Sequence, residues 1–329
     1  MPSNRKCYHR GSLIEICFRT EEGLPLVATP YMRAIIQSIL ARAFSKYRLT
    51  IVAFVVMGNH IHVLVVVNDP KDVSGFIEYL KRELAHAINR LLGRINRTVW
   101  VDGSDVPVIM DSEKALDRLL YVYTNPQKAD LTDTIDEYPN LSSWEAFLAG
   151  GSTETFKRIS RPSVPTLPNR TLSLADQQRL ADQLIEEAHE EFELTIEPDA
   201  WMQCFPDLDD ADPEQIRDEL IERIRNEEQV LGTLRTKPTI GAHALKLETM
   251  RRPHTPKKRS KRMLCLASTR IVRIAYATWR KDLHQAAKDK YKQWCEGDHR
   301  VTLPPGMFWP GGRLVTPCDV DIQEFCSDF

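Results

Sequence analysis

The hydrophobic pattern of this chain is strongest over residues 50–68, where two apolar runs flank the pair Gly58-Asn59. Each run is rich in valine and isoleucine and is long enough for a strand. A Gly-Asn pair between two such runs is a signal for a tight hairpin turn. The pattern therefore predicts a strand over residues 50–57, a two-residue turn, and a second strand over residues 60–67.

Two histidines lie at the start of the second predicted strand. Because side chains alternate along a strand, His60 and His62 share one face. Apolar residues occupy the rest of both faces, which indicates a central strand covered on each side. Two polar rings in such a strand need partners, since burying a polar group without a hydrogen bond is unfavourable. A divalent metal ion would satisfy both rings.

The same kind of pattern defines the elements on either side of the hairpin, including two helices that begin with a capping residue followed by proline. In chain order, the sequence predicts a strand at 12–20, a helix from Thr29-Pro30 to about Tyr47, the hairpin, an amphipathic helix from Asp69-Pro70 to Gly93, and a strand at 106–110. This β-α-β-β-α-β order is that of ferredoxin-like and RRM-like domains. The predicted fold class is α+β, with a central antiparallel sheet that carries helices on one face and leaves the other for a ligand.

The helix predicted over residues 111–124 carries two tyrosines on different faces. Tyr123 continues an apolar stripe at helical spacing, whereas Tyr121 shares a face with Asn125, which lies one turn later. Pro126 is expected to end the helix, because the residue before a proline is pushed out of the α region. Tyr123 is therefore predicted to pack in the core and Tyr121 to lie in a polar neighbourhood.

Basic side chains follow the second helix and the turn after it. Lys81, Arg82, Arg90, Arg94 and Arg97 could track a phosphate backbone. A run of charge on a helix is more often a face exposed to solvent. Contact between these residues and nucleic acid is therefore a hypothesis that the pattern alone does not decide.

Composition narrows the class of protein only moderately. With 329 residues, of which 42% are hydrophobic, the chain can bury a sizeable core and is expected to form more than one domain. A net charge of −2 argues against a uniformly basic nucleic-acid binder. The cysteines number 7, with no C-x-x-C pair, which favours free thiols in a reducing compartment. No stretch resembles a signal peptide or a membrane span, so we expect a cytoplasmic protein without membrane contact.

The character of the sequence changes after residue 150. Residues 151–172 are rich in Gly, Ser, Thr and Pro and predict a linker. Residues 173–329 predict a mainly α-helical extension, within which 251–262 is the densest basic segment. That segment could contact DNA or serve as a solvated tether. The expected domains are thus a first domain over residues 1–150, the linker, and the extension.

The ordered polar residues resemble those of single-tyrosine HUH transposases, including the REP-associated tyrosine transposases and related insertion-sequence transposases. The usual family pattern reads M-x-N-H-x-H and later Y-x-x-x-N-P. In this chain the corresponding residues are Met57, Asn59, His60-Ile61-His62, and Tyr121 with Asn125-Pro126. The stretch from Gln127 to Trp144 also resembles the family's ending. The resemblance covers about residues 8–148.

The resemblance implies a fold, an activity and a set of site residues. The fold would be an HUH domain, in which His60 and His62 bind a metal ion, Asn125 takes the place of a third ligand through its side-chain oxygen, and Tyr121 is the nucleophile. Two imidazoles and an amide oxygen suit Mg²⁺ or Mn²⁺. The activity would be nicking and rejoining of single-stranded or hairpin DNA through a 5′-phosphotyrosine. Such a protein would associate with the nucleoid when bound to DNA.

Two other functions stay open from the sequence. The first is a non-catalytic or domesticated DNA-binding or regulatory protein that keeps the HUH fold, and the weaker one is a metal-dependent phosphodiesterase that uses water. Intact His60, His62 and Tyr121 favour the transposase. One departure from the family is that Trp100 precedes acidic residues, where relatives often have basic ones, so an expected DNA contact is lost. The sequence leaves a homodimer open.

Overall fold

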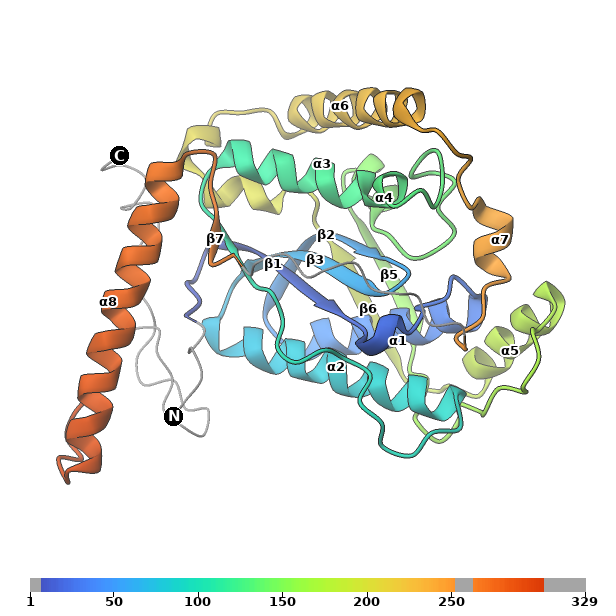
Figure 1. Cartoon of the computed structure of the whole chain (residues 1–329), viewed down its shortest axis with the longest axis horizontal. Coiled ribbons are helices and arrows are strands. Elements are labelled where there is room, and N and C mark those ends of the chain that lie inside the picture. Colours follow the sequence, from blue (N-terminus) through green and yellow to red (C-terminus); the bar gives the residue numbers. More distant parts are fainter. Residues whose placement is uncertain (1–6, 252–262, 305–329) are drawn as a thin grey trace.

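The computed structural model describes residues 7–251 and 263–304, and its centre is a mixed sheet of 7 strands between two layers of helices (Figure 1). The strand order is β5-β6-β2-β3-β1-β4-β7. The predicted α+β class is therefore confirmed.

The four middle strands and the first two helices form the predicted β-α-β-β-α-β unit. Its elements are β1 (Leu13–Arg19), α1 (Pro30–Lys46), β2 (Leu49–Val56), β3 (His60–Val67), α2 (Pro70–Leu91) and β4 (Val108–Ile109). β1 pairs antiparallel with both β3 and β4, and β2 pairs antiparallel with β3. Asp69 caps α2 by accepting a hydrogen bond from the backbone N–H of Lys71, as the Asp-Pro start predicts.

Helices cover both faces of the sheet, so the expectation of one face left open for a ligand is wrong. α1 and α2 pack on one face, and α3 (Ser112–Lys128), α4 (Trp144–Leu148) and α6 (Pro213–Leu234) lie over the other (Figure 1). The second face carries Leu13 and Leu64, which pack with Leu119 and Tyr123 of α3. A strand with apolar residues on both sides needs cover on both sides.

The linker prediction for residues 151–172 is wrong where that segment forms β5. Beyond it, the extension contains α5 (Leu174–Glu186), β6 (Glu191–Ile196), α7 (Ala242–Lys246), β7 (Cys265–Leu266) and α8 (Arg270–Cys295), with short 3-10 turns that include Ala200–Cys204. β5 (Ser152–Lys157) pairs with β6, β6 lies parallel to β2, and β7 lies parallel to β4. The extension thus covers both edges of the central four strands, which would otherwise present unpaired backbone groups.

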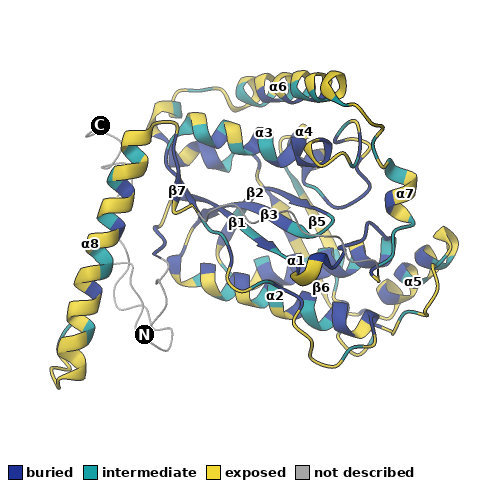
Figure 2. Ribbon diagram, in the orientation of Figure 1, coloured by how far each residue is buried: buried dark blue, intermediate teal, exposed yellow. Residues whose placement is uncertain are grey.

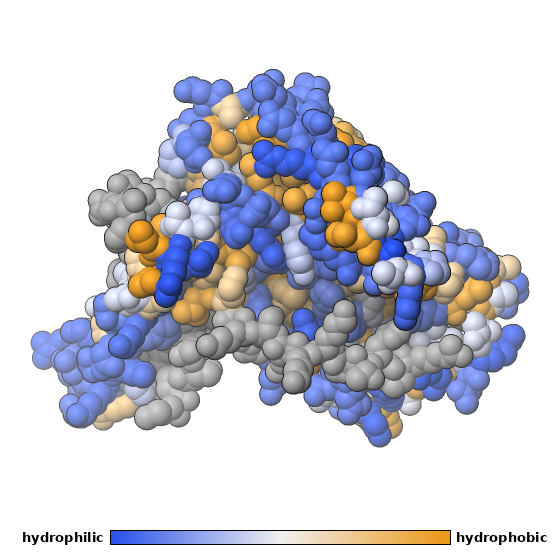
Figure 3. Space-filling model, turned by 45° about the horizontal axis from the view of Figure 1, so that its top comes forward, coloured by the Kyte–Doolittle hydropathy of each residue, from blue (hydrophilic) through white to orange (hydrophobic). Residues whose placement is uncertain are grey.

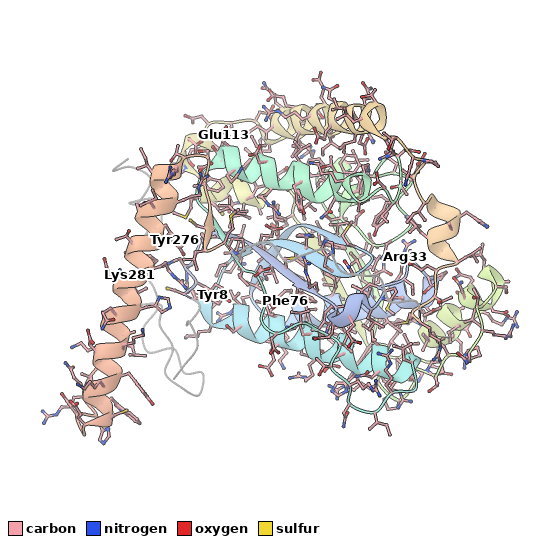
Figure 4. The ribbon with its side chains drawn as sticks, viewed as in Figure 1. Tyr8, Arg33, Phe76, Glu113, Tyr276 and Lys281 are labelled. Carbon is pink, nitrogen blue, oxygen red and sulfur yellow. The ribbon has the colours of Figure 1, made fainter. Side chains whose placement is uncertain are left out.

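α8 packs on the start of the chain through the first half of its length. Tyr276 is buried on the side of α8 that faces Tyr8 (Figure 4), and the Trp279 ring lies 5.4 Å from that of His9. The rest of α8 is largely exposed (Figure 2). Of the basic segment 251–262, only Arg251 lies within the described residues. Within residues 7–251 and 263–304, every helix is too short or too polar to cross a bilayer.

The extension also contributes to the core under α3, and a tryptophan there makes its contribution measurable. Trp201 is 2% exposed and packs in the same cluster as Leu119 and Tyr123. We expect Trp201→Ala to lower the free energy of unfolding by about 3–5 kcal/mol, because it empties a large buried volume. Urea denaturation would measure this loss.

The matched control is Trp294→Ala, since Trp294 lies near the end of α8 and is 39% exposed. It should change the free energy of unfolding by less than about 1 kcal/mol. Equal effects of the two substitutions would show that the extension adds no core to the sheet. On the same reasoning, a fragment of residues 1–150 should fold less stably than the whole chain.

Candidate active site

The two histidines lie at the start of β3 with their rings next to each other. The ring centroids of His60 and His62 are 4.8 Å apart, with the ring planes at 81°. His62 is buried and His60 is partly buried. Because they share the strand face of Leu64, both rings point toward the side of the sheet that α3 covers.

Each histidine ring is held through its Nδ1 atom. Nδ1 of His62 lies 2.7 Å from Oε1 of Glu15, and Nδ1 of His60 lies 2.8 Å from Oδ1 of Asn59. An Nδ1–H that donates to an oxygen fixes the tautomer and leaves Nε2 as the nitrogen that can bind a metal ion. Nε2 of His62 lies 4.0 Å from the Cys17 sulfur. Both rings therefore have the orientation that metal-binding histidines commonly show.

Glu15 connects the histidine pair to α3. Its Oε1 atom accepts from His62 and also from Nη2 of Arg118 at 2.5 Å. Burial alone would raise the pKa of Glu15, but hydrogen bonds and charge from His62 and Arg118 outweigh burial and lower that pKa to about 2. Glu15 is therefore a carboxylate at neutral pH. One of its oxygens accepts hydrogen bonds from both His62 on β3 and Arg118 on α3.

The surroundings shift the pKa values of the two histidines in opposite directions. Burial lowers the pKa of His60 well below its ordinary value, and the nearby charges of His62 and Arg19 lower it further. Burial would also lower the pKa of His62, but Cys17 and Glu15 outweigh it and raise that pKa. A metal ion binds the neutral ring, so metal binding at His62 releases a proton.

Tyr121 extends from α3 to the histidine pair. Its ring centroid lies 5.6 Å from that of His62, and the Arg118 guanidinium lies 4.1 Å from the centre of its ring. Burial, with the charges of Glu15 and Cys17, raises the pKa of Tyr121 above its ordinary value, and the charge of Arg118 offsets part of this rise. A cation above an aromatic ring is a favourable contact that also fixes the ring in place. Tyr121 is thus the tyrosine that the structure brings to the histidines.

Tyr123 points to the opposite side of α3, and its predicted packing role is confirmed. The side chain is fully buried, with its ring 5.1 Å from that of Trp144 and 5.0 Å from that of Phe147. Its hydroxyl lies 3.0 Å from Oγ of Ser143. This hydrogen bond satisfies the one polar atom of an otherwise apolar side chain.

Asn125 lies in the last turns of α3, which is longer than predicted. Asn125 is 6% exposed, and its Nδ2 atom has no hydrogen-bond partner within the described residues. The prediction that Pro126 ends the helix is wrong, because α3 continues to Lys128 with the proline inside. The backbone N–H groups of Ala129 and Leu131 donate to the carbonyls of Asn125 and Pro126 and close this end of the helix.

The metal ligands named from the sequence stay a prediction. Across the described residues, no three His, Cys, Asp or Glu side chains form a group that could hold a metal ion. The candidate set is instead the Nε2 atoms of His60 and His62 and the amide of Asn125, whose buried Nδ2 is unpaired. Turning this amide would present an oxygen without changing its shape, since the two orientations of an Asn side chain are nearly equivalent.

The basic residues proposed to contact nucleic acid lie on the other side of the sheet from Tyr121, and three of them bind groups within the protein. Lys81 donates to two backbone carbonyls, Arg82 pairs with two glutamates, and Arg90 donates to two backbone carbonyls. Arg94 and Arg97 are at least partly exposed, and neither has an ion pair within the described residues. Contact between these five residues and DNA stays a prediction.

Sequence reasoning missed Glu15 and Arg118. Glu15 is an acidic residue inside the apolar strand Leu13–Arg19, and Arg118 lies three residues before Tyr121, on the same face of the helix. A charged residue within a buried strand signals a buried partner of opposite charge.

Trp100, which the sequence analysis placed at a lost DNA contact, is buried. Its ring packs edge-on against Phe18, and its Nε1 donates to a backbone carbonyl.

Comparison with known proteins relates part of this chain to transposases. Residues 14–106 match the model of the family described as "Transposase IS200 like", and this stretch includes His60 and His62. The resemblance to that family is therefore confirmed over these residues. A comparison with curated proteins gives no match. Among solved structures, the chain is similar to one described as "Structure of the REP associates tyrosine transposase bound to a REP hairpin", at 18% identity and a TM-score of 0.39, over 45% of this chain and 86% of that chain.

The role of Glu15 in holding His62 can be tested through metal affinity. Glu15→Ala removes the acceptor that orients the His62 ring, and losing such a partner typically weakens metal binding about 10- to 100-fold. We expect a loss of this size for Mn²⁺, measured by isothermal titration calorimetry, while circular dichroism shows a folded protein. Glu21→Ala, at an exposed glutamate just after β1, is the control. Wild-type affinity in Glu15→Ala would contradict the assignment.

Proposed function

We propose that the protein cuts and rejoins single-stranded or hairpin DNA by transesterification, as a transposase. In this proposal Tyr121 is the nucleophile, and His60, His62 and Asn125 hold a Mg²⁺ or Mn²⁺ ion. The observation that carries it is the position of the Tyr121 ring, 5.6 Å from the His62 ring. The match of residues 14–106 to IS200-like transposases supports the class of reaction.

The reaction would exchange one phosphodiester bond for another. The Tyr121 oxygen attacks the phosphorus, a bond forms between them, and the bond from phosphorus to the 3′-oxygen breaks. The phenol loses one proton and the leaving 3′-oxygen gains one, so the products are a 5′-phosphotyrosine and a free 3′-hydroxyl. A bound divalent ion supplies the positive charge that polarises the phosphate. Attack by a 3′-hydroxyl on the phosphotyrosine reverses the exchange and joins strands without an external energy source.

The surrounding side chains would prepare Tyr121 and the phosphate. A tyrosine with an ordinary pKa near 10 is about a thousandth ionised at neutral pH, so the phenolate must be stabilised. Arg118 lies over the ring and lowers the pKa of Tyr121 against the effect of burial. The Lys128 ammonium lies 5.7 Å from the same ring, and Arg19 lies close enough to His60 to lower its pKa. These three cations would attract a DNA phosphate to the site.

The alternatives make different predictions about products. A non-catalytic DNA-binding protein that keeps the fold would bind DNA without cutting it, and a phosphodiesterase that uses water would cut DNA without a covalent adduct. The contact of Tyr121 with both His62 and Arg118 favours the transposase, because neither alternative needs a tyrosine at that position. Arg94 and Arg97, which lie beyond the end of α2 and are at least partly exposed, remain proposed DNA contacts.

Cleavage should depend on a divalent ion held by the histidines. We expect a chelator or His62→Ala to abolish nicking of a labelled single-stranded oligonucleotide while most of the DNA binding remains, because the ion acts on the phosphate rather than on the whole strand. Denaturing gels and a binding titration would separate the two effects. Full nicking activity of His62→Ala in the presence of chelator would refute this part of the proposal.

The nucleophile can be identified by comparing the two tyrosines. Tyr121→Phe should eliminate the covalent protein–DNA adduct with little change in stability, since it removes a hydroxyl from a partly exposed side chain. Tyr123→Phe is the matched control and should keep the adduct, although losing the hydrogen bond to Ser143 should lower stability by about 1 kcal/mol. Mass spectrometry of the adduct and sequencing of the modified peptide would locate the phosphonucleotide. Its presence on Tyr123 would overturn the assignment.

A further inference from the structure

The C-terminal turn of α3 continues past a proline and is buried. Pro126 removes a backbone N–H from the helix and disfavours helical backbone at Asn125, yet α3 continues to Lys128. Backbone N–H groups of residues 129–131 donate to the carbonyls of Asn125, Pro126 and Gln127, and the side chains of these three residues are buried. Contacts from another element hold the buried side chains of this turn.

Helix α6 supplies these contacts through a buried glutamate. Oε1 of Glu228 accepts hydrogen bonds from Nε2 of Gln127 at 3.0 Å and from the backbone N–H of Ile135 at 2.7 Å. Its Oε2 accepts from Nη1 of Arg225 at 3.0 Å. Glu228 is 6% exposed, so these partners replace the water that its carboxylate loses. One side chain thus ties the last turn of α3 to the loop that follows it.

Two basic residues reinforce this connection. Nη2 of Arg235 donates to the backbone carbonyl of Gln127 at 3.1 Å, and its Nε donates to Asp130 at 3.1 Å. This carbonyl also accepts from the backbone N–H of Asp130, so Arg235 adds a further donor at the last turn of the helix. Nζ of Lys128 lies 3.1 Å from Oε1 of Glu227. α6 runs along α3 on the outside of the molecule (Figure 1), where the surface is mostly hydrophilic (Figure 3).

The turn that α6 holds lies beside the proposed site. Asn125 belongs to it, and Tyr121 lies one helical turn earlier on the same face. A displacement of about 1 Å at a reacting group can slow a reaction about 10²-fold. Resting on the proposed function, we infer that Glu228 is a positioning residue, which sets the placement of Tyr121 and Asn125 for attack on the phosphate.

Glu228 lies far outside residues 14–106, the stretch that matches the transposase family. The proposal therefore gives the extension a part in positioning the reacting groups, beyond the core contacts of Trp201. If Glu228 had a purely structural role, substituting it would change the stability of the protein alone. If Glu228 positions the reacting groups, substituting it lowers the rate of the chemical step at saturating DNA and leaves the affinity for DNA nearly unchanged.

The test is a single-turnover assay with Mn²⁺ and a saturating single-stranded oligonucleotide, in which the rate of covalent adduct formation is measured. Glu228→Ala should reduce this rate about 10- to 100-fold and change the Kd for the oligonucleotide less than about threefold. Glu222→Ala is the matched control, since Glu222 is an exposed glutamate on the same helix, and it should react at the wild-type rate. Glu228→Gln keeps the Oε1 acceptor and should restore most of the rate.

Amide hydrogen exchange over residues 121–131, without DNA, gives a readout that does not depend on chemistry. Glu228→Ala should exchange faster there than wild type and Glu222→Ala. A wild-type rate of adduct formation in Glu228→Ala, or unchanged exchange, would overturn the proposal. If Glu228→Ala does not fold, Gln127→Ala removes the donor on α3 instead and must slow adduct formation in the same way.

The failure of the proposed function would be visible separately. A wild-type protein that forms no adduct would refute the proposed function whatever the variants do. Amide hydrogen exchange would then test only whether the contact with α6 stabilises the end of α3. Unchanged protection of residues 121–131 in Glu228→Ala would show that it does not.

Discussion

The arrangement of the site depends on one buried carboxylate. Glu15 lies in the middle of an apolar strand, and a charge in such a place is tolerated only when partners of opposite charge or hydrogen-bond donors surround it. Its partners are His62 on the neighbouring strand and Arg118 on α3. Because Arg118 also lies over the Tyr121 ring, the same carboxylate links α3 to the histidine strand. The contacts that the buried charge of Glu15 requires thus also position Tyr121, the proposed nucleophile.

Much of the fold could be predicted from the hydrophobic pattern. Runs of β-branched residues and Asp-Pro or Thr-Pro helix starts are local signals, and the β-α-β-β-α-β unit that they predict is confirmed. Strand β5 was missed because Ser152–Lys157 is mostly polar and pairs with β6, which lies far along the chain. The end of α3 was misjudged because Glu228 and Arg235, which stabilise it, come about a hundred residues later. Tertiary contacts override local preference at such places.

The candidate site shows the same division between local and distant information. His60, His62, Tyr121 and Asn125 could be singled out because strand and helix periodicity puts each pair on one face. The pattern could not show that the two faces meet, and the ring contact between His62 and Tyr121 came from the structure. Glu15 and Arg118 had weak signals of their own, but their pairing joins residues far apart in the sequence.

The central claim is that the histidine pair, Asn125 and Tyr121 form one metal-dependent site. The most direct measurement is anomalous diffraction from crystals of the Tyr121→Phe protein grown with Mn²⁺ and a single-stranded oligonucleotide. The account predicts one Mn²⁺ peak bound by Nε2 of His60, Nε2 of His62 and the Asn125 side-chain oxygen, with a phosphate oxygen as a further ligand and the substituted phenylalanine ring beside it. A Mn²⁺ ion bound elsewhere, with Nε2 of His62 still turned to Cys17, would contradict the account.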